Sequence, residues 1–389
     1  MINYDKLISK TLKDIKPSGI RKFFNLLSEM NDVTALTVGQ PDFVTPWHIR
    51  EAAIQSLEEG KTYYTSNAGT TELRGEISKY MKRRFGLDYS AKDEVFVTVG
   101  GSEAIDIAIR SLVNPGDEVI IPTPSFVCYE PITRMAGGVP VIVETKREND
   151  FKLTPSELRS AITDKTKLLV LPFPNNPTGA ILEKEELLAL AEVLRDTNIA
   201  ILSDEIYAEL TYGTSHVSIA SIEGMRERTV IASGFSKAYA MTGWRLGYLL
   251  APEPLLSPML KLHQYAIMCA PTVSQFAAVE ALRSGDEDIE YMKAEYDRRR
   301  RFITDGLRKI GLECFEPRGA FYIFPDISKF GLCSEEFCER LLYEEKCAIV
   351  PGTAFGESGE GFARISYAYS VKHIAEALEK IERFINKLK

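Results

Sequence analysis

A lysine and an arginine lie close together in the chain, in a setting that suits a phosphate-bearing aldehyde. Lys237 follows Ser233 and Ser236, and Arg245 ends a Thr-Gly-Trp-Arg sequence shortly afterwards. A lysine amine can form a Schiff base with an aldehyde, while hydroxyl groups and a guanidinium neutralise a phosphate. A single lysine is more often a solvated surface charge, so the residues that accompany this pair decide between the two explanations.

Three residues that follow other apolar runs extend this chemistry to an aromatic ring. Asp204 follows the run Ile199–Ser203, where a carboxylate is costly to bury unless a cation such as a protonated pyridine nitrogen pairs with it. Tyr207 can donate a hydrogen bond to a ring oxygen. Asn176 lies in the turn Pro174–Gly179, which would direct its amide into a cleft. Considered alone, Asp204 is explained as a helix cap or a member of a salt bridge.

Two weaker indications of a ligand site come directly after other apolar runs. Gly101 and Ser102 open a helical stretch after Glu94–Val99, where backbone N–H groups favour an anion. Phe126 follows Glu118–Pro122 and offers an aromatic face. A plain strand-to-helix turn and a core phenylalanine explain these features equally well. Ligands gather at the carboxyl ends of strands in open α/β sheets, so we expect all these residues at one edge of a sheet.

Short apolar runs predict the strands that position these residues. They are Glu94–Val99, Glu118–Pro122, Val139–Val143, Lys167–Leu171, Ile199–Ser203, Thr229–Ser233 and Arg245–Leu250. Several lack strict alternation, which is typical of strands covered on both faces. Helical patterns lie between them, as in Glu103–Leu112 and Lys184–Arg195. The alternation predicts an α/β fold with a mainly parallel sheet wrapped by helices.

The pattern changes after Pro271 and predicts a smaller α+β domain. A charged helix is expected over Asp286–Lys309, and its run Arg298–Arg301 is typical of a solvated or salt-bridged helix face. Short strands near Ala320–Phe324 and Phe362–Ser366 and a terminal helix near Val371–Lys387 follow. We therefore expect a large domain over residues 46–280 and a small domain built from residues 1–45 and 281–389.

Composition excludes several classes of protein. A chain of 389 residues with 45% hydrophobic and 26% charged residues is typical of a globular protein of two domains. Its formal net charge of −8 argues against nucleic acid or an anionic membrane as a partner. No apolar run approaches the roughly 20 residues of a membrane span, and the N-terminus lacks a secretory layout, so we expect a cytoplasmic protein.

Cysteine and histidine usage predicts no metal site. The six cysteines lack paired CxxC spacing and no histidine cluster accompanies them, so most are expected to be buried thiols in a reducing compartment. None of the four histidines lies in a motif, and structural roles are expected for all of them.

Together the motifs resemble the class I/II aminotransferases that use pyridoxal 5′-phosphate (PLP) and have fold type I. The matching stretches, in order along nearly the whole chain, are Thr37–Phe43, Tyr64, Ala68-Gly69, Glu72–Arg74, Asn176–Gly179, Asp204–Tyr207, Ser236-Lys237, Gly243–Arg245 and Phe362–Ser366. The resemblance implies a mainly parallel seven-stranded sheet with helices on both faces, a smaller α+β domain that closes over the substrate, and a homodimer with shared active sites.

The resemblance also implies roles for single residues. Lys237 would be the Schiff-base lysine, forming the internal aldimine, and the acid and base of a 1,3-proton shift. Asp204 would pair with the pyridinium nitrogen, Asn176 and Tyr207 would contact the phenolic oxygen, and Phe126 would stack on the ring. The phosphate would be held by Gly101, Ser102, Ser236 and Arg245, with Tyr64 reaching it from the neighbouring subunit. Arg364 would clamp the substrate α-carboxylate, together with Gly39 and Asn176.

Departures from the family pattern narrow the expected substrate. Gly234 stands where many relatives have a serine, so the phosphate contact must come from Ser236 or from Ser233. Ser102 stands where a branch of aspartate aminotransferases has a lysine for the distal carboxylate, which argues against a strong aspartate preference.

The N-terminal stretch Ser18–Phe23, Gly39–Phe43 and Ser66–Gly69 are most similar to bacterial N-acetyl-LL-diaminopimelate aminotransferases. We therefore expect that compound, or another amino acid with a polar side chain, as substrate. Arg21 is a candidate for binding a polar group at the far end of the substrate side chain, although an ordinary surface arginine explains it more simply.

Other activities on the same fold remain open. A carbon–sulfur β-lyase or an aminocyclopropane-carboxylate synthase would share the lysine, the aspartate and the arginines, but the complete sequence Thr242–Arg245 and the intact Arg364 favour transamination. A non-catalytic PLP-binding sensor fused to a DNA-binding module is disfavoured by the acidic charge and by the span of the family pattern. A catalytically silent relative is disfavoured because every expected catalytic side chain is present.

Overall fold

The computed structural model describes residues 2–15, 17, 19, 30 and 32–388. Its largest sheet has seven strands in the order β2-β8-β7-β6-β5-β3-β4. They are β2 (Val95–Thr98), β3 (Glu118–Thr123), β4 (Val139–Glu144), β5 (Thr166–Leu171), β6 (Ala200–Asp204), β7 (Thr229–Gly234) and β8 (Gly247–Leu250). β8 runs antiparallel to both of its neighbours, and the other paired strands are parallel. The predicted mainly parallel sheet is confirmed.

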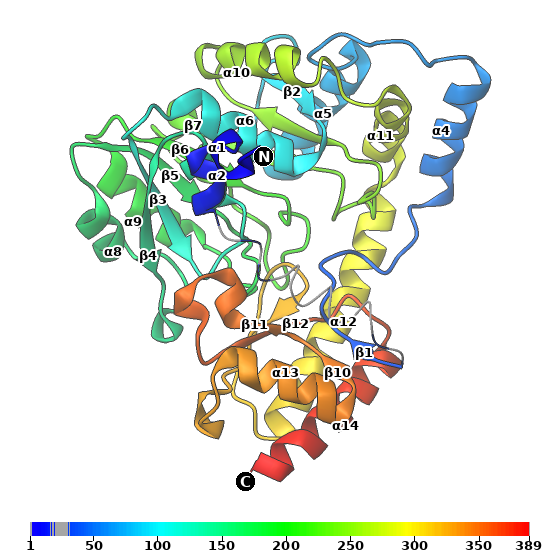
Figure 1. Cartoon of the computed structure of the whole chain (residues 1–389). Helices are drawn as coiled ribbons and strands as arrows, with labels where there is room; N and C mark the ends of the chain where they lie inside the picture. Colours follow the sequence, from blue (N-terminus) through cyan, green and yellow to red (C-terminus); the bar gives the residue numbers. More distant parts are fainter. Residues whose placement is uncertain (1, 16, 18, 20–29, 31, 389) are drawn as a thin grey trace.

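Helices cover both faces of this sheet, as the continuous apolar runs require (Figure 1). Successive residues of β5 point to opposite faces: Leu168 packs in the cluster that contains Ile105 of α6, whereas Leu169 packs with Leu187 of α9. The helices of this part are α4 (Trp47–Glu58), α5 (Thr71–Phe85), α6 (Gly100–Leu112), α7 (Tyr129–Met135), α8 (Pro155–Ala161), α9 (Lys184–Leu194), α10 (Glu253–Ala266) and α11 (Thr272–Ser284).

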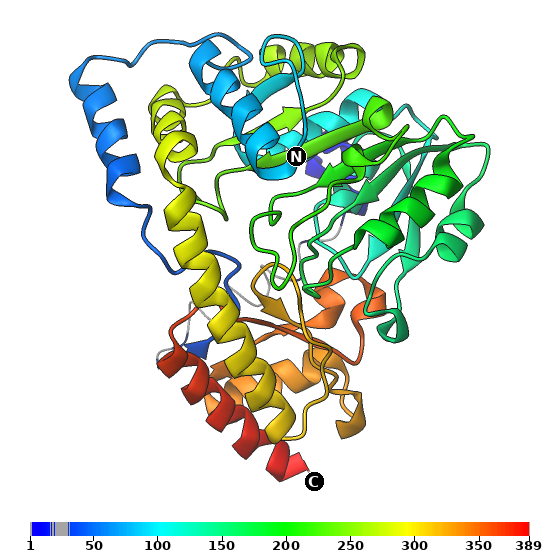
Figure 2. The same cartoon turned by 180° about the vertical axis from the view of Figure 1, so that it is seen from behind.

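A second part of the molecule follows along the long helix α12 (Asp286–Lys309). α12 extends from the neighbourhood of α11 down to the second part, where it packs against the terminal helix α14 (Val371–Leu388) (Figures 1 and 2). The other elements there are α13 (Ser334–Glu345), β9 (Tyr322–Ile323), β10 (Cys347–Ala348), β11 (Val350–Pro351) and β12 (Ala363–Ser366). β12 pairs with both β11 and β9. The predicted smaller α+β part is present.

The N-terminal segment contacts both parts. β1 (Thr34–Ala35) pairs with β10 in the second part. The short helix α1 (Tyr4–Leu7) precedes α2 (Lys10–Asp14), and α2 contacts α7 beside the large sheet. Residues 1–45 therefore do not all associate with the C-terminal part, and the division into two domains stays a prediction.

Two side-chain predictions can be compared with this fold. The run Arg298–Arg301 is salt-bridged as expected, but Arg299 and Arg300 are also buried, because they pair with Asp42 and Glu316 between elements. Of the six free cysteines only Cys338 and Cys347 are fully buried, so the prediction that most are buried was wrong. Within the ranges that the structure describes, no helix is both long and apolar enough to cross a bilayer.

Candidate active site

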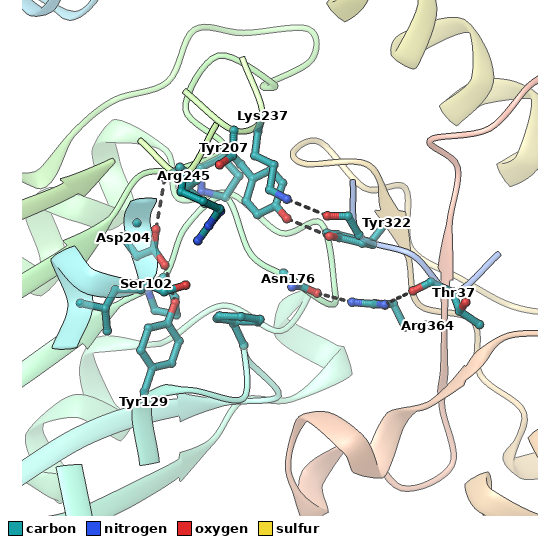
Figure 3. A pocket seen from close by; sticks show the side chains of 18 residues that line it. Thr37, Ser102, Tyr129, Asn176, Asp204, Tyr207, Lys237, Arg245, Tyr322 and Arg364 are labelled. Carbon is teal, nitrogen blue, oxygen red and sulfur yellow. Dashed lines mark hydrogen bonds between the residues drawn. The ribbon is translucent and has the colours of Figure 1, made fainter. Parts of the chain in front are cut away.

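A cavity of about 270 Å³ lies at the carboxyl ends of the central strands, where the second part of the chain meets the large sheet. It is lined by Gly39, Gly101, Ser102, Phe126, Asn176, Asp204, Tyr207, Ser236, Lys237, Arg245 and Arg364 (Figure 3). The structure thus brings together all the site residues predicted from the sequence except Tyr64 and Arg21. Parallel strands place these residues together because their carboxyl ends share one edge of the sheet.

Lys237 follows β7 and reaches into this cavity. Its Nζ donates a hydrogen bond to the carbonyl oxygen of Gly39 at 2.6 Å, and the rings of Tyr207 and Phe321 lie 5.7 Å away. Burial, together with the positive charges of Arg364 and Arg245, lowers the pKa of Lys237 to about 8. The amine is therefore neutral in a larger fraction of molecules near neutral pH than an ordinary lysine would be.

Asp204 ends β6 and is almost fully buried. Its carboxylate accepts hydrogen bonds from the Tyr129 hydroxyl at 2.7 Å and from the Ile206 backbone N–H at 3.2 Å. Burial raises the pKa of Asp204, although these two hydrogen bonds and the charge of Lys237 oppose the rise. Both donors are neutral, so a cationic ring nitrogen in the cavity would suit this carboxylate.

The start of α6 forms an anion cradle with Arg245. Gly100 begins the helix with φ +76°, and a Cβ there would lie 2.7 Å from Nη2 of Arg245. The positive φ favours glycine at this position, and the absence of a Cβ leaves room for the guanidinium beside the helix start, where the helix dipole also favours negative charge. Gly101, Ser102 and Ser236 line the same cavity as Arg245. This donor set fits a phosphate.

The structure explains why a glycine occupies position 234. A Cβ at Gly234 would lie 2.8 Å from the Cα of Gly247 and 2.9 Å from the carbonyl oxygen of Leu246. A serine cannot fit against this backbone without a shift. Ser233 donates its hydroxyl to the carbonyl oxygen of Glu205 at 3.3 Å, whereas Ser236 lines the cavity. Of the two serines that the sequence left open, Ser236 is therefore the one placed for an anion.

Arg364 lies on β12, is 3% exposed and contacts neutral groups within the described residues. Nη1 donates to Asn176 Oδ1 at 3.0 Å and Nη2 donates to the carbonyl oxygen of Thr37 at 2.6 Å (Figure 3). Its guanidinium lies between the rings of Tyr322 and Phe355, at 4.6 and 4.7 Å. Burial lowers the pKa of Arg364, and within the described residues its Nε has no hydrogen-bond partner. A buried cation with a free donor suits a carboxylate ligand.

The turn that carries Asn176 is closed by its neighbour. Asn175 Oδ1 accepts hydrogen bonds from the backbone N–H and the hydroxyl of Thr178 at 3.1 and 2.8 Å. The side chain of Asn175 is thus used inside the turn, and Asn176 is left to face the cavity and Arg364. The predicted direction of the Asn176 amide is confirmed.

Three polar residues of the cavity were assigned no role from the sequence. Tyr129, Tyr322 and Thr37 all line the cavity and contact predicted site residues. Tyr129 lies only three residues after Phe126, and the two rings are 6.3 Å apart, so its place in the same segment was an available signal. Tyr322 comes from a short strand far along the chain, and nothing local distinguishes it from a core aromatic.

Two predicted residues cannot be placed at the site in the single chain. Tyr64 is 79% exposed and does not line the cavity, so its contact with a phosphate across a subunit interface stays a prediction. Arg21 lies outside the described residues. The histidines are engaged elsewhere: His48, His216 and His263 lie against carboxylates, and His373 contacts the carbonyl oxygen of Ala35.

Comparisons with known proteins agree with this site. The family model for aminotransferase class I and II matches residues 31–381. The chain is 54% identical over 380 residues to "Putative aminotransferase YugH" of Bacillus subtilis, with 98% of each chain covered. It is 45% identical to "Probable N-acetyl-LL-diaminopimelate aminotransferase" of the same species, with 98% of this chain and 97% of the relative covered. The solved aspartate aminotransferase from Thermus thermophilus with maleate superposes with a TM-score of 0.92 at 39% identity, covering 97% of this chain and 99% of that one.

Proposed function

The chain belongs to the class I and II aminotransferase family and is a PLP-dependent enzyme, and on that premise we propose that Lys237 binds the cofactor aldehyde while Arg364 receives the substrate α-carboxylate. The enzyme moves an amino group between an amino acid and a 2-oxo acid. The observation that carries the proposal is the convergence of the Lys237 amine, the Asp204 carboxylate and the Arg364 guanidinium on one cavity.

Lys237 serves as the proton carrier of the reaction. When bound, PLP supplies the electron sink that makes the substrate Cα–H acidic. The lowered pKa of Lys237, about 8, leaves part of the amine neutral at physiological pH, so that Nζ can take the Cα proton and later return it. The Gly39 carbonyl and the bordering rings of Tyr207 and Phe321 hold Nζ in the cavity and limit water around it.

The remaining residues orient the two ligands. Asp204 would pair with the pyridinium nitrogen, and the hydrogen bond from Tyr129 holds its carboxylate in place and opposes the rise of its pKa. Tyr207 and Asn176 would contact the phenolic oxygen, and Phe126 would stack on the ring. The start of α6, Ser236 and Arg245 would hold the phosphate.

For the substrate, we favour an amino acid with a polar side chain, and N-acetyl-LL-diaminopimelate is a specific candidate. It is supported by the relative that bears that name at 45% identity. Ser102, which stands where a branch of aspartate aminotransferases has a lysine, argues against aspartate itself as the preferred substrate. The functional unit is expected to be a cytoplasmic homodimer in which Tyr64 of each chain serves the neighbouring site, consistent with the exposure of that side chain here.

Borohydride reduction followed by peptide mapping tests the assignment of Lys237. We expect the reduced pyridoxyl adduct on Lys237 and on no other lysine. An active, coloured enzyme whose adduct maps to a different residue would overturn the proposal. The amino donor is tested by adding a panel of amino acids, N-acetyl-LL-diaminopimelate included, and following the loss of the bound-cofactor absorbance. Pyruvate, 2-oxoglutarate and oxaloacetate are then compared as acceptors of the amino group.

A further inference from the structure

Tyr322 contacts two functional groups that belong to different parts of the fold. It lies on β9, is 1% exposed and lines the cavity. Its hydroxyl lies 2.8 Å from the hydroxyl of Tyr207, which follows β6, and its ring faces the guanidinium of Arg364 at 4.6 Å (Figure 3). One side chain therefore connects the residue assigned to the phenolic oxygen of the cofactor with the residue assigned to the substrate carboxylate.

The surrounding backbone holds Tyr322 in this position. β9 pairs with β12, so that Tyr322 lies opposite Ser366 on the strand that also carries Arg364. On the other side, a Cβ added at Gly39 would collide with the Tyr322 hydroxyl oxygen. The carbonyl of the same glycine accepts the hydrogen bond from Lys237. The hydroxyl of Tyr322 is thus confined between the Gly39 backbone and Tyr207.

The hydrogen-bond capacity of the two hydroxyls sets the direction of the bond between them. Each phenol has one proton to donate, and either oxygen can be the donor in this pair. If Tyr207 donates its proton to the phenolic oxygen of the cofactor, it has none left for Tyr322, so Tyr322 must donate to Tyr207. Burial raises the pKa of both phenols, and the nearby Arg364 cation opposes the rise in both, so both hydroxyls keep their protons and the direction is set by the count of donors.

We propose that Tyr322 is a positioning residue that couples the cofactor site to the site of the substrate carboxylate. Its ring fixes the plane of the Arg364 guanidinium. Its hydroxyl donates a hydrogen bond to Tyr207, so that the Tyr207 proton faces the cofactor. The proposal rests on the functions assigned above to Lys237, Tyr207 and Arg364. Hydrogen bonds arranged in a chain strengthen one another. The hydrogen bond from Tyr322 would therefore strengthen the hydrogen bond that Tyr207 donates to the phenolic oxygen.

Replacing Tyr322 by phenylalanine tests the hydroxyl and keeps the ring. A weaker donor leaves more negative charge on the phenolic oxygen and favours the protonated form of the bound cofactor. In Tyr322→Phe we therefore expect the pH midpoint of the cofactor absorbance change to rise by about 0.2–0.7 unit, with kcat reduced and the KM for the amino acid nearly unchanged. A midpoint that stays in place, or that falls because Tyr207 had been donating to Tyr322, would overturn the proposed coupling.

Replacing Tyr322 by leucine tests the ring. Binding of 2-methylalanine, which has no α hydrogen and therefore cannot be transaminated, is measured by the spectral change of the bound cofactor. Relative to Tyr322→Phe, Tyr322→Leu is expected to weaken this binding roughly threefold to thirtyfold, because the cation–π contact with Arg364 is lost. Equal affinity in the two variants would show that the ring does not position Arg364.

Tyr367→Phe is the matched control. Tyr367 is fully buried and donates to the carbonyl oxygen of Ala320 at 3.2 Å, which Tyr212 also contacts at 2.5 Å. This variant removes a buried phenol hydroxyl outside the cavity and should leave the pH midpoint and the binding of 2-methylalanine unchanged. If borohydride mapping finds no adduct on Lys237, the assignment of Lys237 fails; if the adduct is on Lys237 but Tyr322→Phe does not move the pH midpoint, only the role of Tyr322 fails.

Discussion

The Nζ atom of Lys237 lies 2.6 Å from the carbonyl oxygen of Gly39, so the proposed cofactor lysine is hydrogen-bonded to a segment from the beginning of the chain. Lys237 follows the central strand β7, whereas Gly39 comes shortly after β1, which pairs with β10 in the second part of the fold. The same glycine is in contact with Tyr322. The position of the reactive amine therefore depends on how the two parts of the molecule meet.

Removing the amine of Lys237 should abolish turnover and leave the fold intact. In Lys237→Ala we expect kcat to fall by at least about 10⁴-fold, because the variant lacks both the group that binds the aldehyde and the acid–base catalyst. Circular dichroism should remain that of the wild type, with weaker binding of PLP. Lys261→Ala, which changes an exposed lysine on α10, is the control and should keep full activity. Normal turnover by Lys237→Ala would exclude the assignment.

The lowered pKa of Lys237 should make the stability of the cofactor-free protein depend on pH. Between about pH 8, the folded-state pKa, and about 10.5, the unfolded chain binds more protons at this residue than the folded chain does, so stability rises with pH. Below pH 8 the cost of burying the charged amine is fully present. Lys237→Met should therefore be more stable than the wild type at pH 7, by up to about 3 kcal/mol, and this advantage should shrink as the pH approaches 10.5. Urea unfolding at several pH values measures the difference in the free energy of unfolding between the two proteins. A difference that does not change with pH would contradict the lowered pKa of Lys237.

The hydrogen bond from Tyr129 to Asp204 should matter for the cofactor. Without this donor, burial would raise the pKa of Asp204 further and weaken its interaction with the ring nitrogen. In Tyr129→Phe we expect kcat and the affinity for PLP to fall by about tenfold, as for the loss of a hydrogen bond to a charged group. Tyr212→Phe, which removes another buried hydroxyl, provides the comparison and should change neither quantity. Asp204→Asn should be more severely impaired than Tyr129→Phe, and the reverse order would count against this pairing.

Restoring the serine that many relatives have at position 234 should harm this protein. A Cβ at Gly234 meets the backbone of Gly247 and Leu246, so Gly234→Ser should lower the free energy of unfolding by roughly 1–3 kcal/mol. The affinity for PLP should not improve, since Ser236 already lines the cavity. Gly75→Ser, at a helical position with open space around it, serves as the control and should be tolerated. A stable Gly234→Ser protein with tighter cofactor binding would contradict the steric explanation.

The local sequence pattern was sufficient to predict the strands and the residues at their ends. The run Ile199–Ser203 predicted β6 within one residue, and this placed Asp204 at its carboxyl end. Because neighbouring parallel strands end at the same edge of a sheet, Asn176, Asp204 and Lys237 could be expected in one cavity once the strands were known. The motif around Arg364 was also visible, because it lies within one short strand.

Other features of the site depend on contacts between distant segments. Tyr322 lies beside Tyr207 and Arg364 only because β9 pairs with β12 and both strands meet the end of β6. The need for a glycine at position 234 follows from the close approach of β7 to β8. The fold also decides that Ser236, rather than Ser233, faces the cavity.

The amino-acid sequence by itself determined which residue types stand at the strand ends, since hydrophobic periodicity and turn residues act over a few positions. The tertiary structure alone decided their partners: the Gly39 carbonyl for Lys237, Tyr129 for Asp204, and Tyr322 for both Tyr207 and Arg364. The physical reason is that such contacts depend on the packing of whole elements against one another, and no short stretch of sequence encodes that packing.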